Sequence, residues 1–253
     1  MVTFSEAQVM AWITPWIWPF FRLMGLFTSA PVLSLKGIPR RVKMGLALLI
    51  VVAAQPSLPQ MPAIALNSPE ALMVIAQQVL IGLTLGFAAR VIFAAIEFAG
   101  EIVGLQMGLN FAAFFDPVMA TQSTSISRFY GTCAAWLFVV MNGHLMLTVA
   151  LVESFTAFPV GPDPLEFIRV LQPQVWGAEV FRLGLWVSLP IVAMLMLVNL
   201  VLGLVSRVAP QINIFSVGFP ITIGVGLTGL WLTLPMMQVP FAAALERMLG
   251  YFM

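Results

Sequence analysis

The sequence predicts a single all-α membrane protein built of kinked and broken helical hairpins. Hydrophobic residues make up 61% of the 253 residues and charged residues only 8%, and the mean hydropathy is +1.03. A soluble domain has roughly 25% charged residues, so this composition excludes a soluble fold. The apolar residues fall in long stretches that prolines interrupt, and an internal proline bends or breaks a helix.

Six apolar stretches predict the helices. They cover residues 9–33, 44–66, 71–96, 129–152, 181–206 and 216–245. A spanning helix needs about 20 apolar residues, and only Ala71–Ala89 and Phe129–Val152 approach this without a proline. The other four contain prolines and should be kinked or split into half-helices. The prolines are Pro15 and Pro19 in the first stretch, Pro56, Pro59 and Pro62 in the second, Pro190 in the fifth, and Pro220 and Pro235 in the sixth.

Broken helices are costly in lipid but tolerated where protein surrounds them. We therefore expect other subunits to cover much of the chain, although a conventional six-helix protein with proline kinks stays an alternative. Polar residues at membrane depth favour the assembly: Arg22, Arg90, Glu97, Glu101 and Asn199.

The charges limit the partners and the topology. A net charge of +1 gives no electrostatic argument for nucleic-acid binding. Basic residues cluster once, at Lys36, Arg40, Arg41 and Lys43. The positive-inside rule predicts a cytoplasmic loop there, and an interfacial collar that contacts lipid headgroups or a partner is the alternative. We expect no signal peptide, because the first residues lack a basic region.

Candidate chemistry is sparse. The chain has one cysteine, Cys133, which excludes a disulfide within the chain. It also has one histidine, His144, without further metal-ligating residues close by, so we expect no metal site. No serine elbow or phosphate-binding loop is present, so we expect neither catalytic residues nor a cofactor. Glu97 and Glu101, four residues apart, share a helical face. They are candidates for a proton relay or, more simply, for contact with water or a partner's basic group.

The most informative segment runs from Gly100 to Gln122. Gly100, Gly104 and Gly108 recur every four residues, which predicts a helical face for close packing. A bulky apolar loop follows, and its notable residues are Asn110, Phe111, Phe114, Phe115, Asp116 and Pro117. Irregular backbone at membrane depth survives where protein buries it or a cavity borders it. The loop is therefore expected to line a passage.

A second distinctive segment covers residues 206–226. Pro210 should end the preceding helix, and Gln211 and Asn213 bring amide groups into an apolar region. These amides are expected to fix a turn or to bond to a neighbouring helix, and a ligand site is the alternative.

Four segments in order resemble the FliR family of the bacterial flagellar type III export apparatus: residues 31–47, 99–112, 142–144 and 207–220. The resemblance extends over almost the whole chain. It implies a non-enzymatic subunit of an export gate in the bacterial inner membrane, within the flagellar basal body and raised toward the periplasm. The implied partners are FliP and FliQ in a helical assembly, FlhB, FlhA, the basal-body MS ring and unfolded export substrates.

The resemblance also implies roles for segments and residues. Residues 1–175 correspond to a FliP-like part and 176–253 to a FliQ-like part. The loop at 108–122 corresponds to the plug of the closed pore, with the phenylalanines as its space-fillers. Candidates for subunit contacts are Arg40, Arg41, Lys43, Glu97, Glu101, Arg207, Gln211 and Asn213.

Three other functions stay open. The homologous SctT subunit of virulence injectisomes belongs to the same class. A secondary transporter would also have discontinuous helices and carboxylates at membrane depth, but we find no inverted repeat. A purely architectural subunit with a passive loop is the third.

Overall fold

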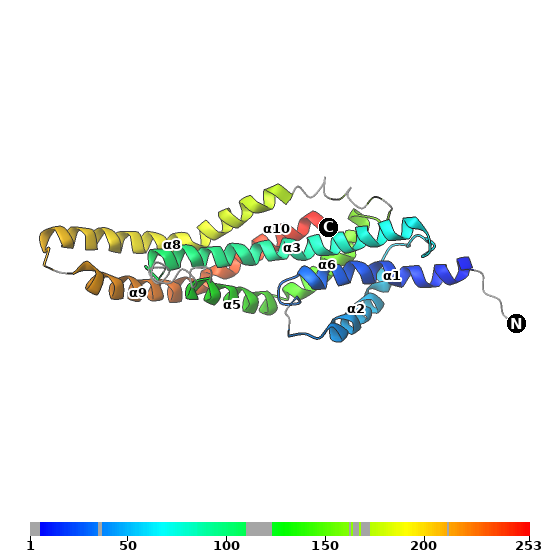
Figure 1. The fold of residues 1–253 in the computed structure, drawn as a ribbon, viewed down its shortest axis with the longest axis horizontal. Coiled ribbons are helices and arrows are strands. Elements are labelled where there is room, and N and C mark those ends of the chain that lie inside the picture. The colour runs from blue at the N-terminus through cyan, green and yellow to red at the C-terminus, as the bar shows by residue number, and fades with distance from the viewer. Residues whose placement is uncertain are drawn as a thin grey trace. The chain divides into compact units, whose positions relative to one another are not determined.

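The computed structural model describes residues 6–34, 37–109, 123–161, 163, 167, 173–211 and 213–253. Within these residues the chain is all-α, as predicted (Figure 1). The α-helices are α1 (Glu6–Ser29), α2 (Arg40–Ala54), α3 (Pro69–Gln106), α5 (Ser125–Val140), α6 (Gly143–Ala157), α8 (Pro173–Val208), α9 (Ile214–Thr233) and α10 (Gln238–Leu249). Short 3₁₀ helices are η1 (Gln55–Ser57), η3 (Leu234–Met237) and η4 (Gly250–Phe252).

The sequence predicts a kink or a split at each proline, and prolines split the helices at only some of these places. α1 continues through Pro15 and Pro19, α8 through Pro190 and α9 through Pro220. A proline removes one intrahelical hydrogen bond, and the bonds on either side keep these helices continuous. α8 nevertheless changes direction along its length (Figure 1).

The predicted breaks do occur at the remaining prolines. Pro56 lies in η1, and Pro59 and Pro62 lie in the non-helical segment that follows it. Pro235 lies in η3, between α9 and α10.

The stretch Phe129–Val152, predicted as uninterrupted, is broken. α5 and α6 are bent by 66° to one another at residues 141–142. Asn142 has a left-handed backbone with φ of 57°. A Cβ at Gly143 would collide with the ring of Phe138 and lie 2.9 Å from its carbonyl oxygen. The bend therefore depends on an Asn-Gly pair, and no proline is involved.

Three regions within the described residues are long and apolar enough to cross a membrane: Pro69–Gln106, Gln174–Val208 and Ser216–Phe252. The bent pair α5–α6 would make a fourth if it counts as one span. Side-chain burial separates the first two. In the most apolar window of α3, 61% of the residues are buried, against 22% for the region of α8. α3 is therefore the more buried of the two helices, and α8 presents most of its apolar surface outward.

The chain divides into two compact units. The first comprises Met1–Arg90, Phe138–Trp176 and Leu245–Met253. In it, α1 and the first part of α3 approach closely at three glycines: Gly25, Gly82 and Gly86. A Cβ at Gly25 would collide with the carbonyl of Val79, one at Gly82 with the carbonyl of Arg22, and one at Gly86 with the hydroxyl of Ser29.

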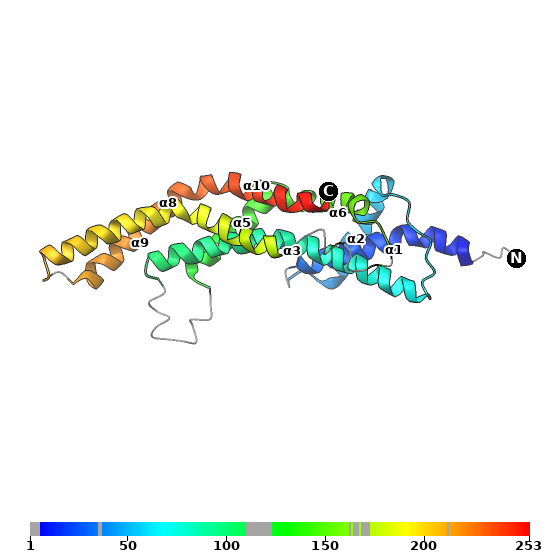
Figure 2. The same ribbon diagram turned by 90° about the horizontal axis from the view of Figure 1, so that it is seen from above.

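The second unit comprises Val91–Leu137 and Gly177–Ala244. α8 and α9 run side by side in both views (Figure 1 and Figure 2), and a Cβ at Gly229 of α9 would lie 3.4 Å from Ile191 of α8. Phe98 of α3 packs edge-to-face on Phe181 of α8, with ring centroids 5.3 Å apart. The division of the chain at residue 175 into FliP-like and FliQ-like parts stays a prediction.

Candidate functional site

The candidate site is the base of the loop at 110–122. The loop residues themselves, including Asn110, Phe111, Phe114, Phe115, Asp116 and Pro117, lie outside the described residues. The structure does place both ends of the loop, at Gly100–Leu109 and Ser123–Ser127. We call these two segments the neck. All neck residues belong to the second unit.

The first side of the neck ends α3 with a Schellman motif. Leu109 donates its N–H to the carbonyl of Gly104 at 3.1 Å, and Gly108 donates to Leu105 at 3.0 Å. Gly108 has φ of 79°, a conformation that glycine adopts without steric cost and that satisfies the free carbonyls of a helix end. The prediction that Gly108 shares a helical face with Gly100 and Gly104 is therefore wrong: Gly108 lies beyond the helix and terminates it.

Gly100 and Gly104 bring α3 close to the start of α5. A Cβ at Gly100 would lie 2.6 Å from the Cα of Ser127, and one at Gly104 would lie 3.1 Å from the hydroxyl oxygen of Thr124. The first distance is shorter than real Cβ atoms tolerate, so only glycine permits this approach at position 100. The two helices are in contact where the loop leaves one and enters the other.

Side-chain hydrogen bonds join the two sides of the neck. The carboxylate of Glu101 accepts the backbone N–H of Thr124 at 2.9 Å. The hydroxyl oxygen of Thr124 accepts the N–H of Ser127 at 3.1 Å, which caps the N-terminus of α5. Ser127 in turn donates its hydroxyl to the carbonyl of Glu97 at 2.9 Å. A carboxylate at a helix N-terminus also interacts favourably with the helix dipole.

α9 holds the same end of α3. Thr222 donates its hydroxyl to the carbonyl of Phe219 at 3.0 Å and lies 3.3 Å from that of Met107. A Cβ at Gly226 would lie 2.6 Å from the side chain of Met107. Met107, Thr222 and Gly226 were not among the site residues that the sequence predicted. The glycine-rich run that contains Gly226 was the available signal, because small residues permit helices to approach closely.

Comparisons with known proteins identify the chain. A family profile described as "Bacterial export proteins, family 1" matches residues 13–248. The flagellar biosynthetic protein FliR of Escherichia coli strain K12 is 40% identical over 241 residues, which are 95% of this chain and 92% of that relative. The chain belongs to this export-protein family.

Further relatives support the same assignment. FliR of Pectobacterium carotovorum is 41% identical over 242 residues, 96% of this chain and 92% of the relative. FliR of the Buchnera symbiont of Acyrthosiphon pisum is 36% identical over 253 residues, 100% of this chain and 97% of the relative. The names of these relatives refer to flagellar biosynthesis, and none of the names is that of an enzyme.

The basic cluster of this export-family chain is helical. Arg40, Arg41 and Lys43 lie in the first turn of α2, whereas the sequence predicted a loop. Arg40 and Arg41 are exposed and Lys43 is half-buried. Positive charges at a helix N-terminus oppose the helix dipole, so the interaction within α2 is unfavourable at these positions.

The other predicted contact residues lie in separate places. Glu97 is exposed, and its carboxylate packs against Gly131 of α5. Arg207 is exposed in the last turn of α8, where its charge favours the helix end. Gln211 is exposed between α8 and α9. The carbonyl of Asn213 accepts the N–H groups of Ser216 and Val217 at 3.1 and 3.2 Å, which sets the start of α9.

Arg22 is the main polar group of the first unit, and it is fully buried. Its guanidinium donates to the amide oxygen of Gln78 at 2.7 Å, the hydroxyl of Ser154 at 2.9 Å and the carbonyl of Phe158 at 2.9 Å. It also lies 3.6 Å from the ring centroid of Phe155. The sequence predicts that Arg22 favours contact with other subunits, but the ligands of its guanidinium come from its own chain.

Within the described residues, no group of three or more His, Cys, Asp or Glu side chains could hold a metal ion. The polar groups of the neck are occupied by backbone and hydroxyl partners. Their arrangement is suited to holding two helix ends together.

Proposed function

We propose that this chain is a structural and gating subunit of the flagellar type III export gate. It forms the protein-conducting pore together with FliP and FliQ, and its loop at 108–122 closes that pore until an unfolded flagellar protein enters. FlhB, FlhA and the basal-body MS ring are the further proposed partners. The proposed location is the inner membrane within the basal body, raised toward the periplasm. The proposed division into a FliP-like part (1–175) and a FliQ-like part (176–253) belongs to the same assignment.

The geometry of the neck is the observation that carries this proposal. Gly108 terminates α3, Glu101 holds the start of α5 and the two helices are in contact at Gly100. A loop anchored in this way has both ends fixed, so it can be displaced without unwinding either helix. A plug needs a fixed base and a loop that can be displaced from the pore.

The composition of the loop supports hydrophobic gating. Three phenylalanines and no lysine or arginine lie between residues 110 and 122. Hydrophobic constrictions gate by dewetting, so a narrow passage filled by these rings would exclude water and ions. An entering polypeptide would replace the aromatic contacts with contacts of its own, which makes opening reversible.

The test measures ion conductance of membranes that contain the assembled complex. Replacing Phe111, Phe114 and Phe115 together with glycine removes the apolar volume, and we expect the membranes to leak ions. The matched control replaces the same three residues with leucine, which keeps an apolar filling and should keep the membranes tight. Assembly is checked in both variants by copurification of the other subunits.

The outcomes separate gating from a purely architectural role. Leakage in the glycine variant but not in the leucine variant supports a hydrophobic plug. An assembled glycine variant whose conductance equals that of the wild type would mean that the loop is passive.

A further inference from the structure

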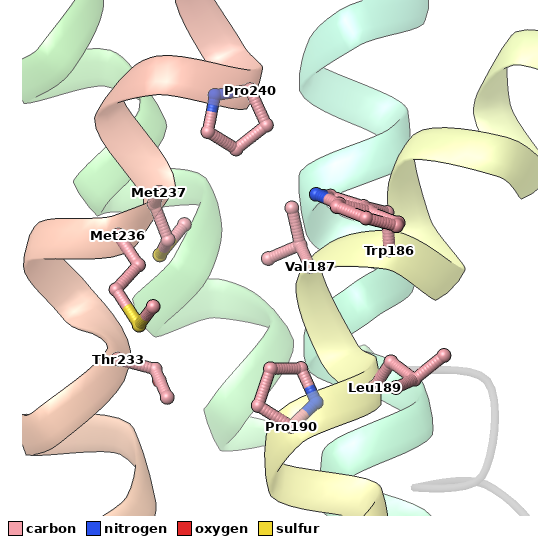
Figure 3. Close-up of a pocket in the computed structure, with 8 residues that line it drawn as sticks. All are labelled: Trp186, Val187, Leu189, Pro190, Thr233, Met236, Met237 and Pro240. Atoms are coloured by element: carbon pink, nitrogen blue, oxygen red, sulfur yellow. The ribbon is translucent and has the colours of Figure 1, made fainter.

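A cavity of about 230 Å³ lies in the second unit, between α8 and the segment around η3 (Figure 3). None of its described lining residues is charged. Thr233 lines it, and its hydroxyl already donates to the carbonyl of Gly229 within the same helix, at 2.8 Å. Apolar groups of many kinds would fill such a cavity equally well, so its chemistry selects no particular occupant.

A larger cavity, of about 530 Å³, lies in the first unit between α6 and the end of α2 with η1. Ile50, Ala54 and Ser57 line it on one side, and Val152, Glu153 and Thr156 on the other. Ser57, Glu153 and Thr156 are exposed, so the cavity is open at the surface. We call it the α2–α6 groove. It differs from the first cavity because a carboxylate belongs to its otherwise uncharged lining.

The carboxylate of Glu153 has no positive partner in the described part of the chain. No described residue forms an ion pair or a hydrogen bond with its side chain. The sequence explains this, because Glu153 is the only Asp, Glu, Lys or Arg in residues 129–162, and residues 44–69 contain none. The hydroxyls of Ser57 and Thr156 likewise form no hydrogen bond with a described residue. The groove therefore presents hydrogen-bond acceptors and a negative charge without a donor.

The two helices that border the groove are otherwise apolar where they are exposed. Leu48, Leu49 and Val52 of α2 and Leu145 of α6 are 52–69% exposed. A bilayer or an apolar helix can cover such side chains, but a carboxylate that faces hydrocarbon is costly. The material that covers these helices must therefore be mainly apolar and must also bring a positive charge to Glu153.

Three kinds of cation fit this groove to different degrees. An inorganic ion would leave the apolar lining of a 530 Å³ cavity uncovered. The ammonium of a zwitterionic phospholipid is joined to a phosphate, and this negative charge would lie close to the carboxylate and repel it. A lysine or arginine side chain has an apolar stem that packs along apolar surface and a charged head that donates several hydrogen bonds. Its chemistry matches the whole lining.

We propose that the α2–α6 groove receives a lysine or arginine side chain from an apolar helix of another subunit. The charged head of that side chain pairs with Glu153, and its stem covers Ile50 and Val152. The partner helix covers the exposed leucines of α2. The inference rests on the proposed function only in placing the chain within a multi-subunit assembly.

The test uses the complete complex in membranes. Benzoylphenylalanine, a photo-reactive amino acid, replaces Ala157, which is exposed one helical turn beyond Glu153 and does not line the groove. Irradiation should join it to another protein chain. Mass spectrometry of the digested adduct should place the attachment within about two helical turns of a lysine or arginine in that chain.

Two variants show whether the charge of Glu153 holds this contact. Glu153→Gln keeps the size of the side chain and removes its charge. We expect the adduct yield to fall about tenfold, as for the loss of one hydrogen bond to a charged group. Glu70→Gln is the matched control, because Glu70 is exposed in the first turn of α3, belongs to the same unit and does not line the groove.

Each outcome decides the proposal. A protein adduct beside a lysine or arginine, with a yield that falls in Glu153→Gln but not in Glu70→Gln, supports it. An adduct with lipid alone, no adduct, an attachment far from any basic residue, or equal yields in Glu153→Gln and Glu70→Gln would overturn it. If the other subunits still copurify in such a case, only this contact is refuted. Their absence from the wild-type preparation would instead refute the proposed function.

Discussion

Gln78→Leu should destabilise the protein more than Arg22→Met, which removes the buried charge that Gln78 solvates. Gln78 accepts a hydrogen bond from the Arg22 guanidinium at 2.7 Å and donates one to Gln77 at 2.8 Å. Hydrogen bonds to charged groups contribute about 1.5–3 kcal/mol and neutral ones about 0.5–1.5 kcal/mol. The loss for Gln78→Leu is therefore about 3 kcal/mol, because Arg22 stays buried with fewer ligands.

Arg22→Met has a different balance. It leaves the amide oxygen of Gln78 and the carbonyl of Phe158 without their donor from Arg22, whereas Ser154 keeps its bond to the carbonyl of Leu151 at 2.6 Å. Against this loss, the protein no longer buries a guanidinium, which costs several kcal/mol. We expect Arg22→Met to be milder than Gln78→Leu, and the double variant to be more stable than Gln78→Leu alone.

The assay is thermal unfolding of the purified complex, followed by tryptophan fluorescence. A loss of 3 kcal/mol corresponds to a fall in Tm of about 6–12 °C for a chain of this size. Gln174→Leu, at an exposed position, is the control and should stay within about 0.5 kcal/mol of the wild type. Two results would refute the role of the buried charge. One is a Tm of Gln78→Leu equal to that of this control, and the other is a Tm of the double variant no higher than that of Gln78→Leu.

Five further variants test the glycines and the neck. Gly82→Ala drives a Cβ into the carbonyl of Arg22 and should lower the stability of the protein by at least about 2 kcal/mol. Its control is Gly203→Ala, in open space within α8, which should raise the stability by up to about 1 kcal/mol. The melting temperatures of the two variants should therefore shift in opposite directions. Gly108→Ala forces a side chain into a backbone with φ of 79°, at about 1–2 kcal/mol, and should speed chymotrypsin cleavage after the loop phenylalanines. Glu101→Ala removes the acceptor for the Thr124 N–H and should raise the same cleavage, with a cost of about 1 kcal/mol; Glu101→Gln keeps an acceptor oxygen and should change it less. Cleavage rates equal to the wild type would show that the neck does not restrain the loop.

The sequence predicted the helical class and the region of each helix, but it misjudged some of the positions at which the helices break. Proline was given the most weight, yet α8 continues through Pro190, while Asn142 and Gly143 bend the stretch that had looked cleanest. An Asn-Gly pair is itself a turn signal, so this break was accessible from the sequence. The continuity of α8 was not, because packing with other helices decides whether a helix survives a missing hydrogen bond.

The partners of Arg22 show a second limit. Its ligands Gln78, Ser154 and Phe158 lie 56, 132 and 136 residues away in the chain. No local pattern connects these positions, so a charge in an apolar stretch was interpreted as a need for another subunit. The neck was predicted only in part. The spacing of Glu97 and Glu101 placed both on one helical face, but no local pattern indicated that α5 covers this end of α3 or that Glu101 accepts the N–H of Thr124.

These findings change the reason for which the chain needs an assembly. Its buried charge is solvated within the first unit, so that charge calls for no partner. The outer surface of α8 poses the opposite problem: Leu185, Leu197 and Leu200 are each more than half exposed. A bilayer can cover those leucines, and so can an apolar helix of a neighbouring subunit. The outward apolar surface of α8, and not a buried charge, is therefore the feature of this chain that a bilayer or a neighbouring subunit has to cover.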